Sequence, residues 1–194
     1  MKFVYRGLII ILILAGSFIA LDSVWFAANL QYELATRGFL KNLDLGNTSI
    51  ATPNFLSIPS LGIKAPIVYA QEAAEPVFQE SLKHGVVHYP GTAKPGKMGN
   101  AYIFGHSSDL PWNAGDFKGV FALLPKTKAG QEIIITDQQG NRFIYKVVET
   151  RVVSADDVSV LDQRQYADKY LTLQTSYPLG TFLKRFIVIA KIKE

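Results

Sequence analysis

Three polar residues at the ends of apolar segments have side chains that could do chemistry: a hydroxyl, a cation and an imidazole. Ser176 ends a strand-like apolar run, and Arg185 opens the next such run nine positions later. His106 follows the end of a third apolar run at 101–104. A hydroxyl can attack a carbonyl when a histidine takes its proton, and an ordinary histidine pKa of about 6.5 makes both protonation states accessible. The alternative interpretation of His106 is a loop histidine bonded to Ser107 or Asp109.

Short strands must position these residues, because the chain from residue 53 onward consists of apolar segments separated by glycine and proline. Turn-forming residues at 137–141 predict a hairpin, and short helical turns are predicted at 117–124 and 155–161. Regularly spaced strands favour a closed or nearly closed β-barrel over a βαβ sheet, so the predicted fold class is mostly β with short helices. The predicted strands cover 55–58, 63–68, 101–104, 132–136, 142–149, 170–175 and 185–191.

The composition indicates a single globular domain with attachments. The chain has 194 residues, of which 48% are hydrophobic and 19% charged, and its formal net charge is +4. Such a charge suits proximity to anionic lipid or cell-wall polymer, but no clustered basic face with interleaved aromatics supports nucleic-acid binding. With no cysteine, neither a disulfide framework nor a thiolate metal site is available.

Two histidines have a spacing that a helix could use to bind a metal. His84 and His88 are separated by four positions, but the residues between them, 85–87, favour a strand or turn, where the two rings lie too far apart for one ion. Ordinary surface or loop histidines are therefore predicted. No acidic cluster marks a calcium site, so no metal and no cofactor are expected.

The amino terminus has the features of a membrane anchor. Lys2 and Arg6 precede an uninterrupted apolar run at 7–21, and extension through Asp22 brings the segment close to the length of about 20 residues that a bilayer requires. A cleaved signal peptide is the competing interpretation. An uncleaved anchor with a cytoplasmic amino terminus is favoured, because positive charges are retained on the cytoplasmic side.

Three segments follow from these patterns. Residues 1–28 are predicted to be the membrane anchor, and 29–52 an amphipathic stalk or linker whose helix could also lie on the domain. Residues 53–194 are predicted to form the working domain.

Two familiar enzyme motifs can be rejected. The segment 91–98 resembles a phosphate-binding loop, but Met98 replaces the hydroxyl that would bind magnesium, and a strand follows where a helix is needed. Ser176 is not in a nucleophile elbow, because Gln174 and Pro178 occupy the glycine positions of G-x-S-x-G. An α/β-hydrolase is therefore disfavoured.

Taken together, the motifs of the working domain resemble those of the sortase family. That family has the pattern T-L-x-T-C followed by an arginine, and here Thr-Leu-Gln-Thr-Ser is followed by Arg185. The order and spacing of the motifs agree across essentially the whole of 53–194. Further similarities lie at 88–92 (His-Tyr-Pro-Gly-Thr), 99–100 (Gly-Asn), 105–106 (Gly-His) and 184–188 (Lys-Arg-Phe-Ile-Val).

The resemblance implies a closed β-barrel of about eight strands behind a transmembrane helix, acting as a transpeptidase on the outer face of a bacterial cell membrane. It implies cleavage of an LPXTG-type sorting signal between Thr and Gly, through an acyl-enzyme. The acceptor would be an amine, such as a cell-wall precursor or a pilin lysine. By similarity, the residue at 176 is the nucleophile, His106 transfers protons, and Arg185 holds the peptide and the oxyanion.

Ser176 departs from the family, which has cysteine at this position. Serine keeps its proton at physiological pH, so it needs a neutral histidine and benefits from a carboxylate, for which Asp109 and Asp116 are the candidates near His106. A serine-dependent enzyme is favoured because the histidine and arginine are both present. The alternatives are a non-catalytic homologue, natural or engineered, that binds sorting peptides, and a purely structural membrane-anchored barrel.

Overall fold

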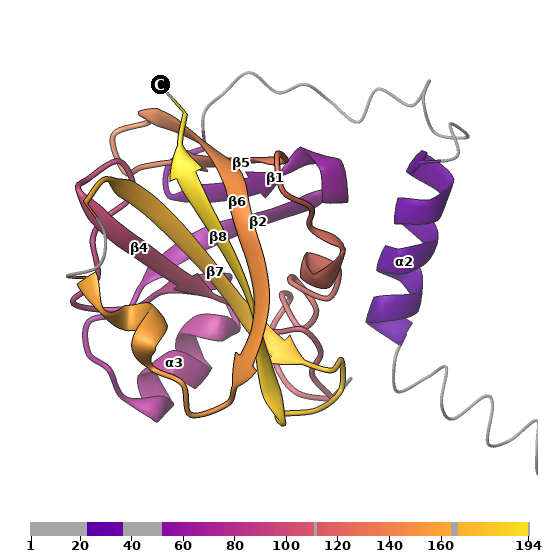
Figure 1. Cartoon of the computed structure of the whole chain (residues 1–194). Helices are drawn as coiled ribbons and strands as arrows, with labels where there is room; N and C mark the ends of the chain where they lie inside the picture. Colours follow the sequence, from indigo (N-terminus) through magenta and orange to yellow (C-terminus); the bar gives the residue numbers. More distant parts are fainter. Residues whose placement is uncertain (1–22, 37–51, 111, 164–166, 194) are drawn as a thin grey trace, which may run out of the picture.

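A computed structural model describes residues 23–36, 52–110, 112–163 and 167–193. Its main body is a closed barrel with the strand order β1-β2-β3-β4-β7-β8-β6-β5, which closes where β5 pairs with β1 (Figure 1). The predicted mostly β barrel is confirmed. The strands are β1 (Phe55–Ile58), β2 (Ile63–Tyr69), β3 (Val86–His88), β4 (Gly99–Phe104), β5 (Glu132–Thr136), β6 (Arg142–Ser154), β7 (Lys169–Tyr177) and β8 (Lys184–Ile192).

Apolar side chains fill the barrel because they alternate along its strands. Ile133 and Ile135 on β5 are fully buried, as are Leu171 and Leu173 on β7. Successive side chains of a strand point to opposite faces, so this spacing directs one set inward and the other to the outer face. On the outer face, a second cluster forms around Tyr102 with Val160, Ile187 and Ile189.

The topology brings three strand ends together. β4 pairs with β7 in parallel, and β7 pairs with β8 antiparallel. The carboxyl ends of β4 and β7 therefore meet the amino end of β8 at one end of the barrel, the lower end in Figure 1. We call this the His106 end, defined by residues 104–106, 176 and 185. The opposite hairpin end is defined by the β5–β6 turn at 137–141.

The strand predictions differ from the structure mainly in length. β1 and β5 have the predicted bounds, whereas β6 continues to Ser154 instead of ending at Glu149. The extension begins with the polar Thr150 and Arg151 but also contains two valines, and it pairs with β8, where Ser154 lies opposite Lys184. β3, with only three residues, was not predicted as a separate strand.

Short helices cover the barrel. α3 (Glu75–Leu82) was not predicted, although Pro76 in its first turn and Glu75 at its start are typical of a helix amino terminus. Its Leu82 packs with Val87 of β3. The turns predicted at 117–124 are present and lead into the 3-10 helix η2 (Leu124–Lys126), and the segment 155–161 contains η3 (Ser159–Leu161). A further 3-10 helix, η1, covers Pro59–Leu61.

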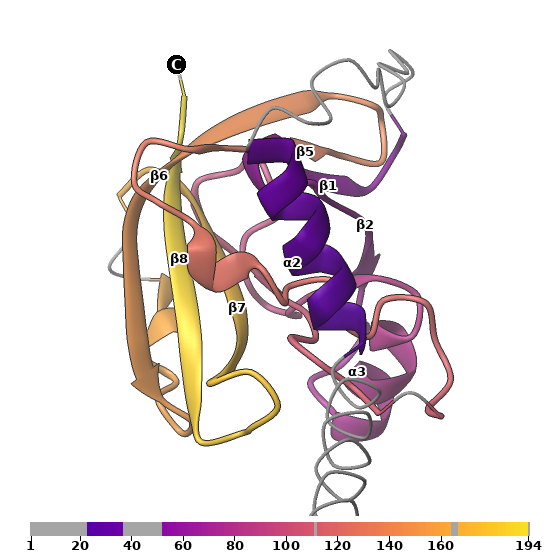
Figure 2. The ribbon, with the colours of Figure 1, turned by 90° about the vertical axis from the view of Figure 1, so that its right-hand side faces the viewer.

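α2 (Ser23–Thr36) packs beside the barrel (Figure 2). Tyr32 contacts the barrel core and lies under the Lys126 ammonium, 4.3 Å from the ring centroid, while Glu33 pairs with the same ammonium at 3.3 Å. The helix runs across the predicted junction between residues 28 and 29. Most of the predicted anchor, 1–22, lies outside the described residues. Among the helices that are described, none is both long enough and apolar enough to cross a membrane.

The prediction of surface or loop histidines is wrong for His88. His84 is exposed, with its Nε2 3.5 Å from a carboxylate oxygen of Glu80. His88 instead lies in β3 and is only 4% exposed, and its Nε2 is 2.8 Å from the carbonyl oxygen of Ala93. Valine neighbours and strand pairing bury this ring. Within the described ranges, no three metal-binding side chains gather as a candidate site.

Candidate active site

The register between β4 and β7 brings His106 level with Ser176. The two strands pair from Gly99 with Lys169 to Phe104 with Gln174, a constant offset of 70 positions. The alignment continues past the end of β4, because the Gly105 amide donates a hydrogen bond of 3.1 Å to the Gln174 carbonyl. With the same offset of 70 positions, the His106 backbone lies beside that of Ser176. Neighbouring strands lie about 4.8 Å apart, so the two backbones are adjacent.

Arg185 lies on the other side of Ser176. The two residues are direct partners in the antiparallel pairing of β7 with β8. Side chains of such partners project from the same face of a sheet, with Cβ atoms about 5 Å apart. Leu173 and Thr175 point into the barrel, so Ser176 and Arg185 project from its outer face. The backbone of Ser176 therefore lies between those of His106 and Arg185 at three successive strand ends.

Thr175 fixes the chain that carries His106. Its buried hydroxyl donates a 2.9 Å hydrogen bond to the carbonyl oxygen of Gly105. From the other side, the Phe121 amide donates to the His106 carbonyl at 2.9 Å. Gly105 has no room for a side chain, because an added Cβ would come within 2.9 Å of the Phe121 ring and 3.0 Å of Val86. These contacts hold the histidine backbone in one position.

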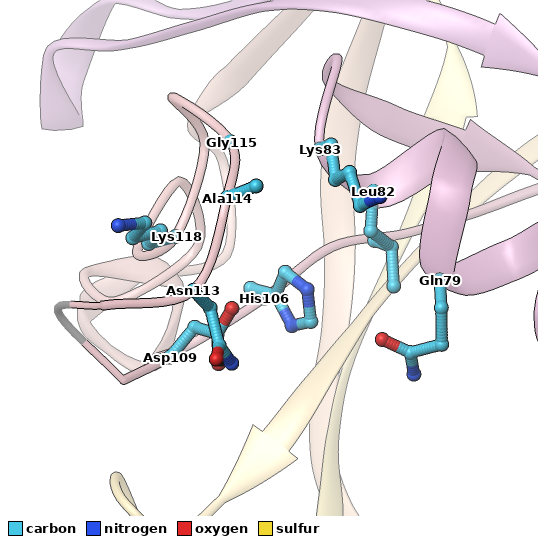
Figure 3. Close-up of a pocket in the computed structure, with 9 residues that line it drawn as sticks. All are labelled: Gln79, Leu82, Lys83, His106, Asp109, Asn113, Ala114, Gly115 and Lys118. Carbon is cyan, nitrogen blue, oxygen red and sulfur yellow. Dashed lines mark hydrogen bonds between the residues drawn. The ribbon is translucent and has the colours of Figure 1, made fainter.

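The His106 side chain projects into a cavity of about 270 Å³ (Figure 3). Gln79 and Leu82 of α3, with Lys83 directly after its end, form one wall of the cavity, and the loop that contains Asp109, Asn113 and Lys118 forms the other. The ring makes no hydrogen bond to any residue in the described ranges. Burial lowers the pKa of His106, and the negative charge of Asp109 opposes that effect. The ring is therefore mainly neutral at pH 7, as a base for a hydroxyl must be.

The two carboxylates considered near His106 differ in position. Asp109 lines the same cavity as the histidine, and its Oδ1 accepts hydrogen bonds from its neighbour Leu110 and from the Asn113 amide group, at 2.7 and 2.6 Å. Asp116 is exposed and does not line the cavity; its amide bonds to the Lys83 carbonyl at 3.3 Å. Asp109 is thus the carboxylate whose charge acts on the histidine.

Backbone carbonyls of the β7–β8 loop orient the Arg185 guanidinium. One terminal nitrogen, Nη1, donates to the carbonyls of Phe182 and Lys184, both at 3.1 Å. The other guanidinium N–H groups have no acceptor within the part of the chain that the structure describes. They remain available to an oxygen of a bound peptide, and the positive charge suits an oxyanion.

Sequence reasoning named His106, Ser176 and Arg185, and Asp109 as a candidate carboxylate, but missed the other residues around them. Thr175 appeared only as a letter of a motif, although its spacing of two and four positions from Leu173 and Leu171 was a usable signal for the inward face of the strand. Gln79, Lys83 and Lys118, which line the cavity, gave no signal because they come from a helix that was not predicted and from a loop. Only the fold brings them to His106.

Comparison with known proteins identifies the class to which this barrel belongs. The family model described as Sortase domain matches residues 56–193. The match covers more than half of the chain, so the chain belongs to the sortase family, whose members are transpeptidases. No relative was found among curated proteins.

Solved structures agree with this assignment. A Clostridium perfringens Sortase D5 transpeptidase is 29% identical over 72% of this chain and 78% of its own, with a TM-score of 0.58. Sortase C from C. perfringens SM101 is 26% identical over 72% and 68%, with a TM-score of 0.56. Group B Streptococcus Pilus Island 1 Sortase C2 is 25% identical over 72% and 73%, with a TM-score of 0.60.

Proposed function

We propose that this protein is a membrane-anchored sortase-type transpeptidase with Ser176 as its nucleophile. It cleaves an LPXTG-type sorting signal between Thr and Gly and transfers the threonine carbonyl to an amine. The observation that carries this proposal is the register that aligns His106, Ser176 and Arg185 on three adjacent strand ends. The family assignment supports the reaction type.

The first half of the reaction forms an ester. The Ser176 oxygen attacks the threonine carbonyl carbon while neutral His106 takes the hydroxyl proton. The tetrahedral oxyanion that results is held by the guanidinium of Arg185. When the carbon–nitrogen bond to glycine breaks, His106 gives its proton to the departing amine, and the acyl group remains on Ser176.

The second half transfers the acyl group. His106, neutral again, takes a proton from the incoming amine as its nitrogen attacks the ester carbonyl. A second oxyanion forms in the same position beside Arg185. Collapse of this intermediate forms the new amide and returns the proton to the Ser176 oxygen, so the enzyme is regenerated.

The lowered pKa of His106 supports serine chemistry in particular. A cysteine nucleophile can exist as a thiolate beside a charged histidine, whereas a serine requires the neutral ring. Burial disfavours the charged ring of His106 and so provides the neutral form.

Separate observations support the proposed acceptor and location. An amine such as a cell-wall precursor or a pilin lysine is the acceptor that we propose, and a similar streptococcal enzyme is named for a pilus island. The basic residues and apolar run at 2–21 support a single-pass anchor with a cytoplasmic amino terminus and an extracellular barrel. Neither a metal nor another cofactor enters the proposed reaction.

A transfer assay with three forms of the full chain tests the nucleophile. We expect the unchanged chain to join an LPXTG-type peptide to an amine acceptor, and Ser176→Ala to lose the activity. Ser176→Cys is the matched variant, since it restores the residue of the family. An unchanged chain that is as inactive as Ser176→Ala, together with an active Ser176→Cys, would contradict the serine mechanism.

One observation favours a second candidate, a non-catalytic module that binds sorting peptides. The Ser176 hydroxyl makes no hydrogen bond to His106 or to any other residue in the described ranges. Catalytic hydrogen bonds often tighten only when substrate binds, so an unbound geometry does not decide between the two. Peptide binding without transfer or an acyl adduct would support the module.

A further inference from the structure

Large apolar side chains are exposed around the His106 end of the barrel. Leu110 and Trp112, on the loop that follows His106, are 46% and 72% exposed, and Phe182 and Leu183 of the β7–β8 loop are 80% and 73% exposed. We call these four residues the apolar rim. Exposed apolar groups gathered in one place typically mark an interaction surface.

The two loops of the rim are held together. The Ser108 hydroxyl accepts a 3.2 Å hydrogen bond from the Gly180 amide. The β7–β8 loop has its own support, because the Thr181 amide and hydroxyl both donate to the Pro178 carbonyl, at 3.0 and 2.8 Å. The rim is therefore one surface built from two connected loops.

The hairpin end is different. Its turn presents the exposed polar side chains of Gln138, Gln139 and Asn141, and the nearby loop has Lys94 and Lys97 on its surface. Met98 is the large apolar side chain exposed there within the described ranges. The two ends of the barrel thus face different surroundings.

α2 shows which end faces the predicted anchor. In both Figure 1 and Figure 2, the Ser23 end of the helix points toward the end of the molecule that carries α3 and the β7–β8 loop. The sequence before Ser23 contains the uninterrupted apolar run at 7–21. A chain that leaves a bilayer and enters α2 at Ser23 would bring the His106 end closest to that bilayer.

We propose that the apolar rim rests on the lipid surface of the membrane that holds the amino-terminal anchor. Tryptophan and phenylalanine are favoured at the boundary between acyl chains and headgroups, and the exposed Lys184 beside Leu183 can reach lipid phosphates. This orientation rests on the anchor of the proposed function and extends it. It places Ser176 at the membrane surface.

Fluorescence of Trp112 in vesicles tests this contact directly. The chain contains two tryptophans, so the full chain with Trp25→Phe reports on Trp112 alone. In vesicles of phosphatidylcholine and phosphatidylglycerol, we expect its emission to shift to shorter wavelength. We also expect lipids with brominated acyl chains to quench this emission. Aqueous acrylamide should quench Trp112 less in the vesicles than in the chain unfolded by denaturant without detergent.

A matched control places tryptophan at the other end of the barrel. The full chain with Trp25→Phe, Trp112→Phe and Gln139→Trp has its single tryptophan on the exposed hairpin turn, and we expect brominated lipids to leave its emission unchanged. Equal emission of Trp112 with and without bromine would overturn the proposal. So would stronger quenching of the control, or failure of the chain to remain with the vesicles.

Acyl-adduct formation, measured on the same vesicles, keeps the two proposals separate. An adduct on Ser176 without quenching of Trp112 would reject the membrane contact and leave the chemistry intact. Quenching without an adduct would reject the chemistry and retain the orientation.

Discussion

The regions around His88 and His106 contain two buried histidines with opposite surroundings. Burial lowers the pKa of both rings. The His88 ring packs on Tyr69 with 5.0 Å between centroids, and its Nε2 lies 2.8 Å from the Ala93 carbonyl and 3.3 Å from the Thr92 hydroxyl. The His106 ring instead borders a cavity, and only its backbone is fixed.

The difference shows how the fold separates structural from chemical roles. At the hairpin end, polar groups are bonded to the protein itself: the Asp137 carboxylate accepts hydrogen bonds from Gln139 and Asn141, and the Tyr145 hydroxyl accepts one from Gly96. At the His106 end, backbone bonds position side chains whose reactive atoms stay available to a substrate. Removing a side chain should therefore cost stability at one end and activity at the other.

His106→Ala should have the largest effect on activity. General acid–base catalysis contributes typically about 10²- to 10⁴-fold, so we expect the rate of peptide transfer to fall by that factor. The free energy of unfolding should change by less than about 1 kcal/mol, because the ring makes no hydrogen bond within the described ranges. Transfer kinetics and denaturant unfolding measure the two quantities. His84→Ala, at an exposed histidine, is the control and should alter neither.

Arg185→Ala should lower the transfer rate by about 10²- to 10³-fold, the usual cost of removing one oxyanion donor. Arg185→Lys keeps the charge but not the planar donors, so we expect it to recover part of the loss. Single-turnover rates of acyl-enzyme formation are the measurement. A purely structural role would instead predict equal losses of folding stability in both variants with no change in the rate per folded molecule.

His88→Ala should show the reverse pattern. Loss of the ring leaves buried polar groups unpaired, so the free energy of unfolding should fall by about 1 to 3 kcal/mol. Because the folded-state pKa of His88 is lowered, the folded chain binds fewer protons than the unfolded chain below pH 6.5. The contribution of the neutral His88 ring to the free energy of unfolding is therefore present above about pH 6.5 and is lost as the pH falls through the lowered pKa. Unfolding measured against pH should show a weaker acid dependence in the variant.

Asp109→Asn should have the smallest effect on activity, and it should move the pH dependence of the rate in a defined direction. The Asp109 charge raises the pKa of His106, so its removal should lower that pKa further. The titration of the His106 ring should then move to lower pH, and the acid limb of the pH–rate profile should move with it. The rate on the plateau, where the ring is neutral, should change little. An acid limb that stays in place would show that Asp109 does not act on the catalytic ring. Asp116→Asn, at an exposed carboxylate outside the cavity, is the control.

Much of the barrel could be predicted from the sequence because local signals coincide with the fold. β5 and β6 are rich in β-branched and aromatic residues, and the turn between them has Asp137 and Gly140, whose φ of +84° suits glycine. The extension of β6 over 150–154 was missed although Val152 and Val153 favour a strand, because Glu149 and Arg151 interrupt the apolar run. Pairing with β8 continues the strand through these charged residues.

The candidate site was predictable in its identity but not in its arrangement. Ser176 and Arg185 stand at the ends of strong apolar runs, so their positions at facing strand ends could be expected. His106 joins them only because β4 pairs with β7 in parallel, which brings together residues 70 positions apart. Asp109 was one of two candidate carboxylates in the sequence, and only the loop conformation distinguishes it from Asp116. The cavity and the apolar rim likewise depend on loop conformations.

Intact mass spectrometry of the full chain with an LPXTG-type peptide, in the absence of an amine acceptor, tests the central claim most directly. We predict a mass increase equal to the peptide up to its threonine, with the bond mapped to the Ser176 oxygen and absent from Ser176→Ala. A chain that binds the peptide but gains no mass, while Ser176→Cys does gain it, would contradict the account.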